Sequence, residues 1–241
     1  MERKSMDLKA RLEQWCDEAI VILFATVLIL MPVFFGGTHT GAFAASEILV
    51  ASSLILWGLK LWLKSSHHLF FTPAVWAVLG LTAYAGLEYM RTPIEFSTRQ
   101  EVMKAVLYCS IFFIFINNLR RRRHTRTFAF CLIGVATLIS FYAIGQFLSG
   151  STQILWVTQA PIYAHRASGT YICPNHLAGF LAMVIPLALA LTLAGRLEQY
   201  QKLLLGFATI IMLAGVAVTI SRGGYIAALA AVAVVLGIFF Q

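Results

Sequence analysis

Long apolar stretches recur along the whole of this 241-residue chain, and they constrain its fold more than any other feature. Stretches of about 18 residues or more are long enough for a helix to cross roughly 30 Å of hydrocarbon, because each residue advances a helix by about 1.5 Å. Hydrophobic residues make up 60% of the chain and charged residues only 12%, whereas about a quarter of the residues in a typical soluble domain are charged. The sequence therefore predicts a polytopic membrane protein.

The predicted fold is all-α, a polytopic transmembrane helical bundle of about eight spans. Helices are expected because an open strand edge in lipid would leave backbone groups unpaired. The predicted spans are residues 19–35, 42–63, 72–90, 102–119, 127–148, 174–194, 203–220 and 224–240. Residues 1–18 are expected to form a cytoplasmic N-terminal segment, either a short helix on the inner membrane surface or a solvated tail. Residues 19–241 then form the transmembrane domain.

The distribution of basic residues predicts the orientation of the chain. Four consecutive arginines in the stretch LRRRRHTR resist translocation and place their loop on the cytoplasmic side, together with the N-terminus. Of the 18 basic residues, 13 then lie on the inner side. The remaining five lie on the outer side: Arg91, Arg99, Lys104, Arg166 and Arg222. The net charge of +8 is therefore interpreted as a topology signal and not as a nucleic-acid site. The loop 149–173 and the turn 221–224 face the same outer compartment, which is the periplasm in a Gram-negative cell.

The outer loop before the sixth span carries an unusual density of polar side chains, in the stretch AHRASGTYICPNHLAGF. Ser168 and Thr170 supply hydroxyls close to Arg166, and Asn175 follows the proline that opens the next span. The unpaired backbone N–H groups and the positive dipole end of that span are expected nearby. A guanidinium beside a helix N-terminus is a good phosphate receptor. Snorkelling of Arg166, and ordinary capping by Ser168 or Asn175, are the structural alternatives.

The second polar motif is SRGG, which lies between the last two apolar runs. An arginine is costly near the membrane, by about 2.5 to 3.5 kcal/mol at the centre of a span. Ser221 and Gly223 flank Arg222, and the glycines let the backbone turn sharply and approach a ligand. Arg166 and Arg222 are joined by one helical hairpin and share a compartment. Two guanidinium forks there predict a ligand with several anionic oxygens, such as a diphosphate. A tight turn with a snorkelling arginine is the alternative.

Other polar residues carry weaker hypotheses. His165 and His176 flank the predicted site and are weak candidates for a general base, although such histidines more often only form hydrogen bonds. No metal or cofactor is expected, because no carboxylate or thiol stands at a useful spacing. Glu47 and Glu88 lie within apolar spans, where carboxylates are often functional, and an ion pair with an outer arginine such as Arg91 is the alternative.

Small residues recur at every fourth position in the sixth and eighth predicted spans. They include Ala178 and Ala182 in the sixth span, and Gly223, Ala227 and Ala231 in the eighth. Small residues at this spacing let helices approach closely in lipid. These residues are therefore predicted to face neighbouring helices.

The segment RASGTYICPNHLAGFLAMVIPLALAL, followed one hairpin later by VTISRGGYIAALAAV, resembles the O-antigen ligase-like superfamily. That family includes O-antigen ligases, O-antigen polymerases and bacterial protein O-oligosaccharyltransferases. The similarity is strongest over residues 163–232. It implies a metal-independent glycan transferase at the outer face of the bacterial inner membrane, with Arg166 and Arg222 matching the family's two arginines that contact the donor diphosphate. The donor would be an undecaprenyl-diphosphate-linked glycan, and the acceptor a hydroxyl on a growing glycan, on lipid A core or on a protein.

The sequence departs from the family pattern at its end. Family members have further spans and a large periplasmic loop with a histidine expected to act as the base, whereas this sequence ends at Gln241. Neither His165 nor His176 matches that histidine. The chain is therefore expected to hold the donor-binding half of a site and to be inactive alone if the later loop is missing. A multispan transporter or flippase of a lipid-linked glycan, or a non-catalytic envelope scaffold, are the alternative functions. Ligase, polymerase and protein glycosyltransferase are not separated by the sequence.

Overall fold

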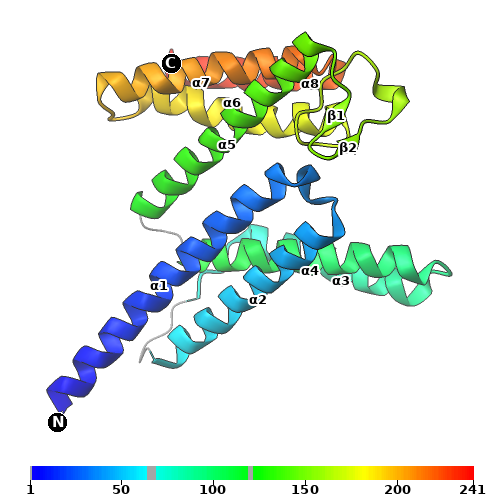
Figure 1. Ribbon diagram of the computed structural model, residues 1–241. Coiled ribbons are helices and arrows are strands. Elements are labelled where there is room, and N and C mark those ends of the chain that lie inside the picture. The colour runs from blue at the N-terminus through cyan, green and yellow to red at the C-terminus, as the bar shows by residue number, and fades with distance from the viewer. Residues whose placement is uncertain (1, 64–68, 119–121) are drawn as a thin grey trace. The chain divides into compact units, whose positions relative to one another are not determined.

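The computed structural model (Figure 1) describes residues 2–63, 69–118 and 122–241. Within these residues, the structure consists of eight α-helices and a few short elements. The helices are α1 (Glu2–Val33), α2 (Thr40–Leu63), α3 (Pro73–Arg91), α4 (Glu95–Asn118), α5 (Arg122–Ser149), α6 (Pro174–Ala194), α7 (Gln199–Val218) and α8 (Arg222–Phe239). The predicted all-α class is confirmed, and the predicted bounds of the sixth span coincide with those of α6.

The short elements lie in the α1–α2 and α5–α6 connections. The 3-10 turn η1 (Phe35–Gly37) follows α1, and η2 (Pro161–Tyr163) precedes α6. The strands β1 (Gln153–Ile154) and β2 (Val157–Thr158) form an antiparallel hairpin in which Ile154 pairs with Val157. This hairpin was not predicted, because two-residue strands give no periodicity in the sequence.

Seven of the described helices are long and apolar enough to cross a membrane. This confirms a multi-pass membrane protein whose helices contact lipid. The helix α3 coincides with the predicted third span but does not reach the same hydropathy. Its sequence contains Pro73, Gly80, Gly86 and Glu88, and these residues lower its mean hydropathy. The orientation of the N-terminus stays a prediction.

The first helix is longer than the predicted first span. α1 runs without interruption from Glu2 to Val33, and its apolar part covers Arg11–Val33. The predicted N-terminal segment 1–18 is therefore helical from residue 2, and it continues directly into the first span. Its cytoplasmic location stays a prediction.

Contacts divide the chain into two compact units. The first unit comprises Met1–Val27 and Ala44–Thr125, and the second comprises Leu28–Phe43 and Arg126–Gln241. In the first unit, α3 packs along α4, and the Trp57 ring on α2 meets the Phe113 ring on α4 edge-on at 5.4 Å. Val75 and Ile114 are fully enclosed there. Aromatic and branched side chains thus form contacts between the helices of this unit.

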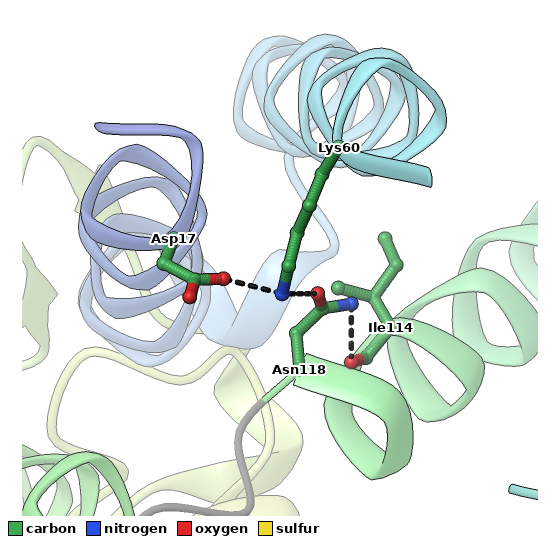
Figure 2. A network of polar contacts seen from close by, with 4 residues as sticks. All are labelled: Asp17, Lys60, Ile114 and Asn118. Atoms are coloured by element: carbon green, nitrogen blue, oxygen red, sulfur yellow. Dashed lines mark hydrogen bonds and ion pairs between the residues drawn. The ribbon is translucent and has the colours of Figure 1, made fainter. Parts of the chain in front are cut away.

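A partly buried polar network joins three helices of the first unit (Figure 2). Lys60 Nζ on α2 donates to Asp17 Oδ1 on α1 at 2.5 Å and to Asn118 Oδ1 on α4 at 3.0 Å. The Asn118 amide in turn donates to the carbonyl of Ile114 at 3.2 Å. The side chains of Lys60 and Asp17 are only 14% and 16% exposed. Charges this enclosed need their partners, so the network fixes the contacts of these three helices.

The second unit is built around α6. The helices α7 and α8 both pack against α6 and run alongside it (Figure 1). Leu177, Leu181 and Ile185 on α6 are completely buried, and Met212 on α7 meets the same core. The core also includes Ala136 on α5. This packing brings the N-terminal ends of α6 and α8 into one unit with the loop between α5 and α6.

The face that α8 presents to α6 differs from the predicted one. Gly223 and Ala227 are exposed and Ala231 is half-buried, whereas Gly224 and Ala228 are buried. A Cβ added to Gly224 would lie 2.5 Å from the Cβ of Ala178 on α6. The small-residue contact therefore exists, but it uses the face of α8 that begins one residue later than predicted. One residue turns a helix by about 100°, so adjacent positions face different neighbours.

The contact at Gly224 predicts a stability difference between two adjacent glycines. Gly224→Ala is expected to destabilise the chain by about 1–3 kcal/mol, because the new methyl group overlaps Ala178 and forces α6 and α8 apart. Gly223→Ala is the matched control: its added Cβ would meet no atom within 4 Å, and alanine has the better helix propensity. Denaturant unfolding of the detergent-purified variants measures both effects. Equal unfolding midpoints for the two variants would contradict the close approach of α8 to α6 at Gly224.

Candidate functional site

The loop between α5 and α6, residues 150–173, holds Arg166 through backbone hydrogen bonds. The Arg166 amide donates to the Tyr163 carbonyl at 3.1 Å, and the Arg166 carbonyl accepts from Gln159 Nε2 at 3.2 Å. The next amide, that of Ala167, donates to the Val218 carbonyl at the end of α7 at 3.0 Å. These bonds tie the loop to the helical hairpin that leads to the SRGG motif.

The guanidinium of Arg166 bridges two parts of the second unit. Its Nε donates to the Thr219 carbonyl at 2.9 Å, and Nη2 donates to Asn175 Oδ1 on the first turn of α6 at 2.6 Å. Its Cζ lies 5.9 Å from the centre of the Tyr163 ring. Only two of its N–H groups are used in these hydrogen bonds, so the other donors of the fork remain available to a ligand. Arg166 is half-buried, which limits how far this fork can move.

Arg222 is placed by the cap of α8. Ser221 is the N-cap residue, and its hydroxyl accepts a hydrogen bond from the Gly224 amide at 3.2 Å. Arg222 is the first residue of α8 and is exposed. The first backbone N–H groups of α8 are free of helical partners, as at every helix start. The arginine and these N–H groups thus present positive charge at the same place.

Both arginines line one open groove of about 550 Å³. Its lining comes from the loop, the first turns of α6 and α8, and the turn between α7 and α8. The lining residues are Arg166, Asn175, Gly179, Ile220, Ser221, Arg222, Gly223, Gly224 and Ala227. The structure therefore brings together Arg166, Asn175, Ser221, Arg222 and Gly223 from the predicted site.

The groove carries positive charge without an acidic counterpart. No Asp or Glu lines it, and Glu198 is the only acidic side chain of the second unit. Glu198 follows the far end of α6, whose 21 residues span about 30 Å at about 1.5 Å per residue. That separation exceeds the screening length of about 8 Å at physiological salt. The two guanidinium groups are therefore available to an external anion.

The remaining predicted site residues do not line this groove. Ser168 is fully buried, and its hydroxyl has no hydrogen-bond partner among the described residues. Thr170 is also buried and donates to the Pro32 carbonyl at 2.6 Å. His176 is exposed on α6 and His165 is exposed in the loop, and neither lines the arginine groove. Thr170 thus anchors the loop, and the structure offers no base within the groove from these histidines.

Gln146 on α5 supports the loop and was missed in the sequence. Its Oε1 accepts from the Gly169 amide at 2.8 Å, and its Nε2 donates to the carbonyls of Gly169 at 3.1 Å and Gln153 at 2.6 Å. Gly169 has φ of +58°, and a Cβ there would lie 2.9 Å from Cγ2 of Ile139. Only glycine fits this position easily. A lone glutamine within an apolar span was the available signal, since such a side chain needs a partner.

The pKa of Cys173, the N-cap residue of α6, reflects the electrostatic environment at this end of the helix. Burial raises the pKa of the Cys173 thiol. This effect is outweighed by a hydrogen bond with Tyr163, by the backbone N–H groups of Asn175 and His176, and by the charge of Arg166. The pKa of the thiol is therefore lowered below its ordinary value. The hydrogen bond with Cys173 is the main cause of the raised pKa of Tyr163. Helix N–H groups and an arginine that stabilise a thiolate also stabilise other anions.

The intramembrane carboxylates are placed in the first unit. Glu47 lines a cavity of about 260 Å³ between α2 and α4, together with apolar residues and Ser110. No ion pair between Glu88 and Arg91 is present in the described part of the chain, so the predicted pairing of these two residues is not found. Among the residues that the structure describes, no group of three or more His, Cys, Asp or Glu is placed to hold a metal ion.

Comparisons with known proteins add no relative. No protein-family model matches the chain, and neither the curated proteins nor the solved structures give a match. The chemistry of the arginine groove and the resemblance over residues 163–232 are therefore the grounds for a functional proposal.

Proposed function

We propose that this chain binds an undecaprenyl-diphosphate-linked glycan at the arginine groove and serves its transfer to an acceptor hydroxyl at the outer face of the bacterial inner membrane. The reaction would be of the O-antigen ligase or polymerase type. One observation carries the proposal: Arg166 and Arg222 line a single groove that has no acidic side chain. The resemblance to the O-antigen ligase-like superfamily supplies the identity of the donor.

The groove suits a diphosphate for three physical reasons. Two guanidinium forks match the several oxygens of a diphosphate better than those of a single carboxylate. The N-terminal end of α8 adds backbone N–H groups, and α6 and α8 both add positive dipole ends. The site also lies at the ends of apolar helices, so that a charged headgroup can bind while its hydrocarbon chain stays in lipid.

Small residues offer a path for the prenyl chain of the donor. Gly179 on α6 and Ala227 on α8 line the groove beyond the arginines. Ile226 and Leu229 on α8 are 70% and 69% exposed, and they provide an apolar surface beside it. A prenyl chain leaving the diphosphate would therefore lie along α6 and α8, where small side chains permit close contact.

The transfer step assigns the arginines an electrostatic role. The acceptor oxygen attacks the anomeric carbon, the bond from that carbon to the diphosphate oxygen breaks, and undecaprenyl diphosphate leaves with the negative charge. Positive groups that already lie where the negative charge of the leaving diphosphate develops lower the activation barrier of the transfer. The proton of the acceptor hydroxyl passes to a base. Neither His165 nor His176 lines the groove, so neither is assigned this role.

Lipid binding and glycan transfer test the proposal separately. We expect the chain, purified in detergent, to bind undecaprenyl diphosphate more tightly than undecaprenyl monophosphate, by about 10-fold or more, as one additional charge-assisted hydrogen bond would provide. Native mass spectrometry with both lipids measures the preference. Equal binding of the two lipids, or binding of neither, would contradict the proposal.

Transfer is assayed in vesicles that contain the chain, a glycan-loaded donor and an acceptor glycan or lipid A core. Formation of the glycosylated acceptor supports a transferase. Movement of the intact donor between leaflets without product would instead favour the flippase alternative. Donor binding with neither product nor movement would limit this chain to the donor-binding part of the reaction.

A further inference from the structure

A second cavity adjoins the arginine groove. Its volume is about 360 Å³, towards the lower end of the range of roughly 300–1,000 Å³ for small-molecule sites. Arg166 and Ile220 line both spaces. The other lining residues come from the end of α5 and from the outer loop: Gln146, Phe147, Gly150, Ser151, Thr152, Gln159, Ala164, His165 and Ala167. We name this space the loop cavity.

The loop cavity contains a buried amide with an unused acceptor. Gln159 is only 9% exposed, and its Nε2 donates to the Arg166 carbonyl. Its Oε1 accepts no hydrogen bond from the described residues. Gln159 therefore offers an acceptor to a group inside the cavity.

Two other polar groups of the loop cavity are also available to form hydrogen bonds with a ligand. Neither the Thr152 hydroxyl nor the His165 imidazole has a hydrogen-bond partner within the described part of the chain. His165 is held with φ of +63°, a conformation that is uncommon outside glycine. Phe147 and Ile220 add apolar surface and are 44% and 48% exposed.

These groups define the chemistry of the occupant. Among the lining residues that the structure describes, Arg166 carries the only charged side chain, so the cavity disfavours a cation. Amide, hydroxyl and imidazole groups beside apolar walls suit a neutral group that carries hydroxyls and has one face that is less polar than the other. A prenyl chain would leave these polar groups without partners, which disfavours it.

We propose that the loop cavity binds the first sugar of the lipid-linked donor. This inference rests on the proposed function, because the sugar is placed by the diphosphate to which it is bonded. Arg166 borders both spaces, so a diphosphate in the arginine groove has its sugar-bearing phosphate next to the loop cavity. The cavity thereby distinguishes a glycan-loaded carrier from the free carrier that remains after transfer.

The test compares a prenyl diphosphate with and without a sugar. The probes are farnesyl diphosphate and its glucose, galactose and N-acetylglucosamine conjugates, each titrated against the detergent-purified chain. At least one conjugate is expected to bind about 10-fold more tightly than farnesyl diphosphate, as two ordinary hydrogen bonds would provide. Ala164→Trp fills the cavity and is expected to abolish this gain while leaving the affinity for farnesyl diphosphate unchanged.

A second pair of variants guards against misfolding of the tryptophan variant. Thr152→Val removes one hydroxyl from the cavity and is expected to reduce the gain about 3- to 10-fold. Thr158→Val removes a hydroxyl from the same loop outside the cavity, and it is expected to retain the full gain. Unfolding midpoints equal to that of the parent show that these variants are folded.

The outcomes separate this inference from the proposed function. Binding of farnesyl diphosphate without any gain from the three sugars overturns the sugar site and leaves the diphosphate site intact. An equal gain in the parent and in folded Ala164→Trp or Thr152→Val also overturns it. If none of the four probes binds to the parent chain, the proposals of a diphosphate site and of a sugar site are both wrong.

Discussion

Arg222→Ala is expected to lower the affinity for undecaprenyl diphosphate by about 30-fold or more, which corresponds to the loss of roughly 2 kcal/mol for one partner of a charge pair. The same variant is expected to keep the unfolding midpoint of the parent. Arg222 is exposed and makes no hydrogen bond or ion pair with another residue of the described ranges. Its removal is therefore expected to leave the stability of the fold almost unchanged, while the ligand loses its contacts with one guanidinium fork.

Arg166→Ala is expected to lose both affinity and stability. Its guanidinium holds the Thr219 carbonyl and the Asn175 side chain, and each such hydrogen bond contributes about 0.5–1.5 kcal/mol. The two arginines are thus distinguished by the unfolding measurement, although both line the groove. Lysine at position 222 is expected to restore only part of the affinity, because an ammonium group cannot form the bidentate fork.

Arg196→Ala is the matched control for charge. Arg196 is exposed in the turn after α6, far from the groove, and its removal changes the net charge by the same amount. Binding is measured by native mass spectrometry and unfolding by thermal denaturation. If Arg196→Ala weakens binding as much as Arg222→Ala does, the attraction is non-specific and the groove is not the site.

Lys60→Met is expected to destabilise the first unit by about 3–5 kcal/mol, the usual cost of leaving a buried charge unpaired. The variant removes the ammonium group shared by Asp17 and Asn118 (Figure 2). The Asp17 side chain is 16% exposed, and this partial access to solvent places the expected cost at the lower end of that range. Combining Lys60→Met with Asp17→Leu is expected to recover most of the loss, because no isolated charge remains.

Lys104→Met provides the control for a surface ion pair. Lys104 contacts Glu101 at 2.7 Å, but the two side chains are 38% and 65% exposed, and such pairs contribute only about 0–1 kcal/mol. Denaturant unfolding measures the stability, and hydrogen exchange of α2 and α4 locates the change. Equal stability of the Lys60 and Lys104 variants would show that the network in Figure 2 does not hold the helices together.

The predictions from sequence were most accurate where a local signal was strong. Apolar length alone located the helices, and the proline at the start of α6 defined its first residue. The Arg166 and Arg222 motifs were recognised because polar residues are conspicuous beside apolar runs. In contrast, the buried face of α8 was assigned to Gly223 and not to Gly224, since periodicity identifies a stripe of small residues without showing which neighbour it meets.

The sequence by itself determined a multi-pass helical protein and the two polar motifs, because hydrophobic length and the cost of buried charge act locally along the chain. Only the tertiary structure decided that Arg166 and Arg222 share one groove, that Gln146 holds the loop, and that Lys60 pairs with Asp17. These contacts join residues that are distant in sequence, and they depend on how α5, α6 and α8, or α1 and α2, pack against one another. Helix packing sets the distances between such side chains, and hydropathy along one chain carries no information about those distances.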